Sequence, residues 1–220
     1  MTARDEADTD RPALRADAER NRQRILSAAS EVFAERGLDV SLDDIAEAAG
    51  VGIGTVYRRF GDKDALIDAL LENRVGEVVE LARRCLEEPD AWTAFSRFVY
   101  GVCGLNAQDR GLKEALLSDD RGGDRIRRGR DQIAPLAFEL LRRAQAAGVV
   151  RADLAGTDVP LLHFGVGYVA ERTRDVAPEY WQRAATILLD GLVVRRDGPS
   201  PLPADALTPD QLPQALGRRR

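Results

Sequence analysis

The sequence has few of the residues that build metal sites and disulfide frameworks. Its 220 residues include two cysteines, Cys85 and Cys103, and one histidine, His163. Structural zinc sites draw their ligands mainly from cysteine and histidine, and disulfide-rich domains use several cysteine pairs. We therefore expect neither a structural zinc site nor a disulfide framework, and the sequence favours a reducing compartment.

Long apolar runs are also missing. No segment approaches the roughly 18 uninterrupted apolar residues that a membrane-spanning helix needs. Residues 1–10 are acidic and polar, unlike a secretory signal. Apolar residues still make up 44% of the chain, which is enough for a buried core. The sequence predicts a cytoplasmic protein without a membrane span.

The residue patterns of common enzymes are absent too. One histidine does not supply a nucleophile, base and acid set, no glycine-rich phosphate loop precedes a Lys-Ser/Thr pair, and no metal-ligand spacing occurs. We expect a protein that is not an enzyme and binds no cofactor.

The overall charge argues mildly against a nucleic-acid partner. The formal net charge is −5 and the isoelectric point is near 5.1. A contact face depends on a few local residues rather than on this sum. The charges therefore have to be examined segment by segment.

Helical periodicity begins at Asp17 with an apolar stripe that ends at Gly37. The stripe consists of Ile25, Leu26, Ala29, Val32 and Phe33. Ser41 and Asp44 then form a capping-box pattern at the start of a second helix. That helix buries Leu42, Ile45, Ala46 and Ala49.

A break at Gly50-Val51-Gly52 separates the second helix from a third, which runs from Ile53 to Phe60. Ile53, Val56 and Phe60 form its apolar face. Gly61-Asp62 ends this helix and caps a long fourth one over residues 63–87. Two short helices joined by a tight glycine turn, after a packing helix, are typical of a helix-turn-helix unit.

The remaining pattern predicts an all-α chain in which an N-terminal three-helix domain precedes a larger helical domain. We expect further helices over residues 90–106, 109–118, 124–147, 157–172 and 178–196. Val149-Val150 is a short segment that suits a strand as well as a helix. The predicted organisation is a flexible arm (1–17), the helix-turn-helix domain (18–65), a larger helical domain (66–197) and a disordered proline-rich tail (198–220).

The third helix carries polar groups suited to nucleic acid. Thr55, Tyr57, Arg58 and Arg59 place a hydroxyl, a phenol and two guanidinium groups within five residues. Such groups reach phosphates and base edges when a helix lies in the major groove. Between Arg58 and Lys63 the chain holds three cations and one acid, so this face is basic although the protein is acidic.

Residues 18–70 resemble a known family. The features that carry the resemblance are Arg24-Ile25-Leu26, Phe33-Ala34-Glu35-Arg36-Gly37, Ser41-Leu42-Asp43-Asp44-Ile45-Ala46, Gly50-Val51, Gly54-Thr55-Val56-Tyr57-Arg58-Arg59-Phe60 and Lys63-Asp64-Ala65-Leu66. In order and spacing they are similar to the N-terminal domain of the tetracycline-repressor (TetR) family. The resemblance implies a homodimeric repressor that binds a double-stranded DNA operator and is released by a small ligand. It implies that residues 18–65 form the DNA-binding domain and residues 66–197 the ligand-binding and dimerisation domain.

The resemblance also implies roles for single residues. Tyr57, Arg59 and Lys63 correspond to phosphate contacts, and the family commonly has histidine at the position of Arg59. Thr55 and Arg58 face the bases or the nearest backbone, and Ser41 contacts phosphate at the start of its helix. The alternative is a helical interaction module whose basic helix docks an acidic protein partner and binds no DNA.

The second half must be interpreted from its residues. Small residues recur on two late helices, namely Gly165, Gly167 and Ala170 on one and Ala184, Ala185 and Gly191, beside Ile187 and Leu188, on the other. Glycine weakens a helix, so close approach of another backbone is one reason to keep it there. We predict a homodimer through helices 157–172 and 178–196, as a four-helix bundle between two chains. The alternative is packing of these residues within one chain.

A ligand site between helices would be apolar with a few polar groups. Candidate ligand-binding residues are Trp92, Phe95, Phe98, Val99, Val102, Phe138, Leu141 and His163, and the expected ligand is a small apolar or amphipathic molecule. The alternative is that these residues are core, with His163 as a hydrogen-bonded core residue. Cys103 is interpreted as a buried structural thiol rather than a redox sensor.

Overall fold

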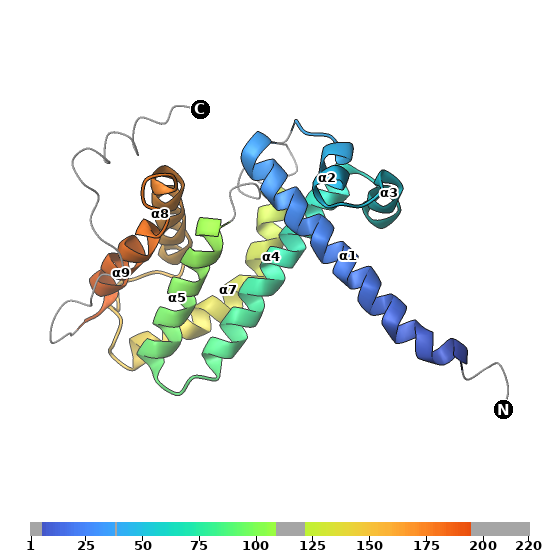
Figure 1. The fold of residues 1–220 in the computed structure, drawn as a ribbon. Coiled ribbons are helices and arrows are strands. Elements are labelled where there is room, and N and C mark those ends of the chain that lie inside the picture. The colour runs from blue at the N-terminus through green and yellow to red at the C-terminus, as the bar shows by residue number, and fades with distance from the viewer. Residues whose placement is uncertain (1–5, 38, 109–121, 195–220) are drawn as a thin grey trace. The chain divides into compact units, whose positions relative to one another are not determined.

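Every regular element that the structure describes is a helix (Figure 1). The computed structural model describes residues 6–37, 39–108 and 122–194. The predicted all-α class is confirmed. The predicted helix 109–118 and the predicted tail 198–220 lie outside the described residues.

The chain divides into two compact units. The described residues of the first unit are 6–37, 39–73 and 122–125, and those of the second are 74–108 and 126–194. The boundary lies inside the fourth helix, α4 (Lys63–Leu86), rather than after residue 65 as predicted. The reason is that Leu66, Ile67, Leu70 and Leu71, at the start of α4, are buried residues of the first unit.

The first helix, α1 (Glu6–Arg36), begins well before the predicted start at Asp17. The predicted start of the helix at Asp17 is therefore wrong, because residues 6–17 also belong to it. This stretch carries no apolar stripe, but it contains alanine, leucine, arginine and glutamate, which favour helix by intrinsic propensity. A search for amphipathic periodicity does not detect such a helix.

The apolar stripe of α1 and its predicted end are confirmed. Ile25, Ala29 and Phe33 are fully buried. Gly37 has a φ of 74°, and its N–H donates to the carbonyl of Phe33 at 3.0 Å. A positive φ of this kind suits glycine, so the helix stops where the sequence predicts.

In the second unit α5 (Ala91–Gln108), α8 (Asp158–Thr173) and α9 (Tyr180–Leu192) pack against one another (Figure 1). One hydrophobic core joins them to the end of α4 and to α7 (Gly122–Ala146). Arg143 of α7 donates to the carbonyls of Leu86 and Glu88 at 2.7 and 2.8 Å. These bonds satisfy backbone acceptors at and just beyond the end of α4 and tie α7 to that end.

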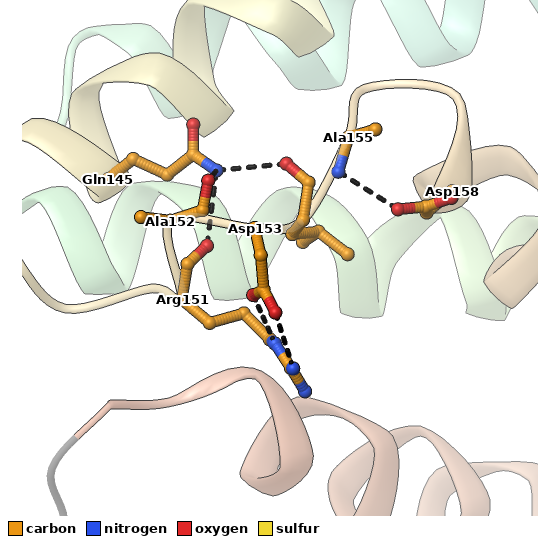
Figure 2. A network of polar contacts seen from close by, with 7 residues as sticks. Gln145, Arg151, Ala152, Asp153, Ala155 and Asp158 are labelled. Atoms are coloured by element: carbon orange, nitrogen blue, oxygen red, sulfur yellow. Dashed lines mark hydrogen bonds and ion pairs between the residues drawn. The ribbon is translucent and has the colours of Figure 1, made fainter.

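A polar network holds the connection between α7 and α8 (Figure 2). Gln145 Nε2 lies within hydrogen-bond distance of the carbonyls of Arg151, Ala152 and Leu154, at 3.1, 3.4 and 2.9 Å. Near the start of α8 the N–H of Ala155 donates to Asp158 Oδ2 at 2.9 Å. The network fixes the path of a segment that has little regular structure of its own.

The ambiguous pair Val149-Val150 is neither helix nor a full strand. Val150 forms an isolated antiparallel bridge with Val193, directly after α9. The N–H of Arg151 donates to the carbonyl of Leu192, and that of Val194 to Val149, at 3.0 and 3.1 Å. The bridge ends α9 at Leu192, earlier than the predicted 196, because Val193 takes an extended conformation.

Within the described ranges no helix is long and apolar enough to cross a membrane. In the same part of the chain no three His, Cys, Asp or Glu side chains are grouped to hold a metal ion.

Candidate nucleic-acid interface

Two helices of the first unit, α2 (Leu42–Ala48) and α3 (Ile53–Phe60), form the predicted helix-turn-helix. Their turn is closed by hydrogen bonds from Gly50 N–H to Glu47 and from Val51 N–H to Ala46, both at 3.0 Å. Gly50 has a φ of 63°, which favours glycine. The short turn keeps α3 packed against α2, which in turn packs against α1.

The predicted capping box at the start of α2 is present. Ser41 Oγ accepts from Asp44 N–H at 3.2 Å, and Asp44 Oδ2 accepts from Ser41 N–H at 2.9 Å. Hydrogen bonds from the Ser41 side chain and backbone, together with Arg36, lower the pKa of Asp44 below its usual value. Asp44 therefore stays ionised, and the Ser41 hydroxyl also donates to it. The hydroxyl of Ser41 is thus already used in capping α2, and the predicted phosphate contact of Ser41 would be an additional interaction.

Burial of one side chain decides how α3 is oriented. Val56 is fully buried, whereas Ile53 and Phe60 of the predicted apolar face are half-buried. Tyr57 is consequently turned outward, with 52% of its surface exposed, and Arg58 is exposed beside it. Aromatic side chains of this size are commonly buried, so an exposed tyrosine next to arginine fits a contact surface better than a packing role.

The exposed face of α3 is partly ordered by its own hydrogen bonds. Arg58 Nη2 donates to Thr55 Oγ1 at 3.2 Å, one turn earlier on the helix. A Cβ added at Gly54 would lie 3.3 Å from Arg58 Nη1, so the glycine leaves room for the guanidinium group. The structure thus brings Thr55, Tyr57 and Arg58 together on one short helix, as predicted.

Lys63 follows the end of α3 after a two-residue connection, Gly61 and Asp62. Gly61, with a φ of 83°, ends α3, and Asp62 Oδ1 accepts from Ala65 N–H at 2.8 Å to cap α4. Lys63 is the first residue of α4 and is half-buried. The cap predicted from Gly61-Asp62 is confirmed.

Arg59 has a partner that the sequence did not indicate. Its Nη2 lies 3.5 Å from Glu19 Oε2 on α1, and Glu19 Oε1 lies 3.4 Å from Arg22 Nη1. Glu19 and Arg22 fall outside the predicted contact residues because they belong to the helix that packs against the others. Alternating charges from Asp17 to Arg24 were the available signal, but only the fold pairs them with α3.

The candidate ligand-binding residues of the second unit divide into two groups. Phe95, Phe98, Val99, Val102 and Leu141 are buried in one core, and Trp92 packs against it half-buried. Phe138 is instead 48% exposed. Its ring covers Gly156, where an added Cβ would lie 1.9 Å from Phe138 Cε1. Phe138 is thus not part of the group that the core brings together.

His163 on α8 is the unusual member of this core. It is 7% exposed, it lies edge-on to Phe98 with ring centroids 6.3 Å apart, and its Nε2 has no hydrogen-bond partner among the described residues. Burial lowers its pKa from 6.5 to about 4, so the ring is neutral at physiological pH. The interpretation of His163 as a hydrogen-bonded core residue is therefore wrong for Nε2.

The two cysteines are buried thiols. Cys103 is fully buried, and burial raises its pKa to about 12. Burial also raises the pKa of Cys85. Because the thiolate is the reactive form, both groups are poor redox sensors.

Comparison with known proteins places both units in one family. Residues 25–70 match the model of bacterial regulatory proteins of the tetR family, and residues 90–194 match the C-terminal domain of SbtR-like transcriptional regulators. The crystal structure of a TetR transcription regulatory protein from Mycobacterium vanbaalenii is 36% identical, with a TM-score of 0.62 over 82% of this chain and 99% of that one. The chain belongs to the TetR family of transcriptional regulators.

Two further proteins are similar to this TetR-family regulator over part of the chain or in fold. An HTH-type transcriptional regulator of Staphylococcus aureus, SAR0097, is 37% identical over 81 residues, which are 36% of this chain and 42% of the relative. The chain therefore matches less than half the length of this curated relative. FadR from Bacillus subtilis, solved in complex with stearoyl-CoA, has a TM-score of 0.63 over 77% of this chain and 98% of that one. At 19% identity it shows that the fold is shared.

Substitutions at the predicted contact residues should separate phosphate contacts from base contacts. Lys63→Ala is expected to weaken binding to all duplexes alike and to lower the slope of log affinity against log salt by about 0.9, because the predicted phosphate contact of Lys63 is lost. Arg58→Ala should cost about 1–3 kcal/mol on the operator and relax preference at one position. Gel shifts at several salt concentrations measure both effects.

Arg83→Ala is the matched control for these variants, because it removes an exposed cation of α4 within the second unit. It should leave the salt slope unchanged. An unchanged slope for Lys63→Ala would remove Lys63 from the interface, and a uniform loss across sequences would make Arg58 a phosphate contact.

His163 should lower the stability of the second unit in acid. Its folded pKa of about 4 lies below the unfolded value, so protonation favours the unfolded state and stability falls as pH drops from 6.5 towards 4. His163→Leu removes this titrating group. We expect its free energy of unfolding, relative to that of the wild type, to rise by roughly 2–3 kcal/mol between about pH 7.5 and about pH 4.5. Urea unfolding at both pH values tests this, and parallel pH dependences would contradict the buried, neutral imidazole.

Proposed function

We propose that this regulator represses transcription by binding an operator as a homodimer and is released by a small apolar or amphipathic ligand. The outward face of α3, where Tyr57 and Arg58 are exposed while Val56 is buried, carries the DNA-binding part of the proposal. Thr55, Arg59, Lys63 and Ser41 complete the proposed contact set. Membership of a family of transcriptional regulators favours DNA over an acidic protein as the partner of this face.

The proposed dimer interface rests on an exposed apolar face of the second unit. On α8 Leu161, Phe164 and Tyr168 are 69%, 54% and 49% exposed, and their spacing of three and four residues places them on one side of the helix. On α9 Ile187 is 52% exposed. Aromatic and aliphatic residues gathered in this way favour burial against a second chain.

The small residues that suggested this interface divide between two roles. Gly165 and Gly191 are exposed, with nothing within 4 Å of an added Cβ, and so belong to the proposed face. Ala170 and Ala185 are buried in their own chain. A Cβ at Gly167 would lie 3.6 Å from Asn106 Cβ of α5. Packing within one chain therefore accounts for these three positions.

The proposed partner of the exposed surface of α8 and α9 is a second copy of the chain, because operator recognition needs two DNA-binding units. A single helix-turn-helix reads one half-site, and dimers place two recognition helices one helical turn apart. The proposed partner of α8 and α9 is thus another copy of this chain, with the four helices forming a bundle.

The proposed ligand site involves the core around His163, with Trp92, Phe95, Phe98, Val102 and Leu141. Its support is an apolar environment that contains one unpartnered polar atom. Phe138, which is partly exposed, remains a candidate ligand-binding residue outside the buried core. The presence of stearoyl-CoA, an amphipathic molecule, in FadR of Bacillus subtilis agrees with the proposed ligand class.

The helix α4 offers a physical link from ligand to DNA. It is continuous from Lys63 to Leu86, so residues of the DNA-binding unit and of the core share one helix. Bound ligand would lower the affinity for operator only to the extent that the ligand binds the conformation that cannot bind DNA more tightly than the conformation that can. Operator must then weaken ligand binding by the same factor.

Selection of bound duplexes from a random pool tests the DNA-binding function. We expect a two-fold symmetric site whose half-sites lie about 10–10.5 base pairs apart or a multiple of this. Gel shifts should show roughly 10³-fold or greater preference for that site over random duplex, with affinity falling steeply with salt. Equal affinity for selected and random duplex would favour the interaction-module alternative.

Charge placed on the exposed face of α8 and α9 should separate the dimer. The double variant Phe164→Glu and Ile187→Glu is expected to be monomeric and to lose operator binding, because two carboxylates cannot be buried without partners. Sedimentation equilibrium measures the mass, and Gln132→Glu, at an exposed position on α7, is the control for added charge. Dimers that persist in the double variant would place the interface elsewhere.

A further inference from the structure

The carboxylate of Glu19 lies between two guanidinium groups from different helices. Its Oε1 is 3.4 Å from Arg22 Nη1 on α1, and its Oε2 is 3.5 Å from Arg59 Nη2 on α3. The two arginines thus face the two oxygens of one anion. All three residues lie in the first unit, and Arg59 belongs to the proposed DNA-contact set.

This arrangement is one that a phosphodiester can take over. The two non-bridging oxygens of a backbone phosphate share one negative charge, as the two oxygens of a carboxylate do, and arginine binds both groups in the same forked manner. Arg22 and Arg59 already face the two oxygens of one anion beside the recognition helix. They are therefore suited to bind the two non-bridging oxygens of one phosphate in the same way.

The existing ion pairs are weak enough to be exchanged. The side chain of Glu19 is 62% exposed and that of Arg59 is 38% exposed, so water screens the interaction. Both separations exceed those of well-formed charge-assisted hydrogen bonds. Arg22 is less exposed, at 26%, and therefore holds its place on α1 more firmly than a fully solvated arginine would.

We propose that Arg22 and Arg59 form a binding site for one DNA backbone phosphate, and that Glu19 occupies this site until DNA displaces it. The inference rests on the DNA binding proposed above. It adds Arg22, on the packing helix, to the contact residues of α3. It also assigns to Glu19 the role of an internal competitor, which lowers affinity for every duplex because a phosphate carries no sequence information.

Glu19→Gln is the first test, because glutamine keeps the shape of the side chain and removes its charge. We expect operator and random duplex to be bound tighter by the same factor, roughly two- to fivefold, which is the range for an exposed ion pair. The ratio of the two affinities should not change. Glu31→Gln removes the same charge at an exposed position on the same helix and is the matched control.

Arg22→Ala is the second test. It should weaken binding to all duplexes and lower the salt slope by at most about 0.9, since one of the two cations that neutralise this phosphate is lost. Arg22→Lys keeps the positive charge and should restore most of the slope. Thermal unfolding of each variant, followed by circular dichroism, shows whether the fold is kept.

A mutant cycle separates competition from a general effect of charge. If Glu19 acts by occupying the arginines, Glu19→Gln should give no gain in a chain that already carries Arg22→Ala and Arg59→Ala. A gain that persists in that background, an equal gain from Glu31→Gln, or an unchanged salt slope for Arg22→Ala would overturn the inference. Failure of the wild type to bind any duplex would instead overturn the proposed function.

Discussion

The first unit depends on the burial of Val56, the fully buried side chain of a helix of eight residues. So short a helix is not stable alone, and its conformation and orientation come from packing. With Val56 inside, Tyr57 and Arg58 must point outward. The capped start of α2 and the left-handed glycine at position 50 then set where this face is presented.

The second unit combines a well-packed interior with two features that packing within the described chain leaves uncovered or without a partner. One is the apolar face of α8 and α9, which leaves Leu161 and Phe164 in water. The other is the unpartnered Nε2 of His163 inside the core. A buried polar atom without a partner costs on the order of 1–3 kcal/mol. Both features become favourable only if something else covers or contacts them, and this supports a role in binding.

The charge distribution reconciles an acidic protein with a DNA partner. The net charge is −5, yet the outward face around α3 is rich in arginine. Glu19 moderates that face by pairing with Arg22 and Arg59. Such a pairing limits repulsion between the cations in the free protein, and a polyanion can replace it. The same local charges therefore serve both the free and the proposed bound state.

Local features were predictable from the sequence because neighbouring residues decide them. The stripe of α1 that ends at Gly37, the capping box of Ser41 and Asp44, and the cap at Asp62 are interactions within a few residues. Membership of a family followed from the same ordered motifs. The helical start of α1 was missed because it rests on propensity and has no apolar period.

Contacts between distant segments were decided only by the tertiary structure. The pairing of Arg59 with Glu19 joins two helices that are far apart in the chain, and no spacing rule connects them. Ala170 and Ala185 are small residues at helical spacing, as are the exposed Gly165 and Gly191, so composition does not show which of them face the core. The missing partner of His163 likewise depends on what the other helices bring near it, because satisfaction of a buried polar atom is a property of the packed core.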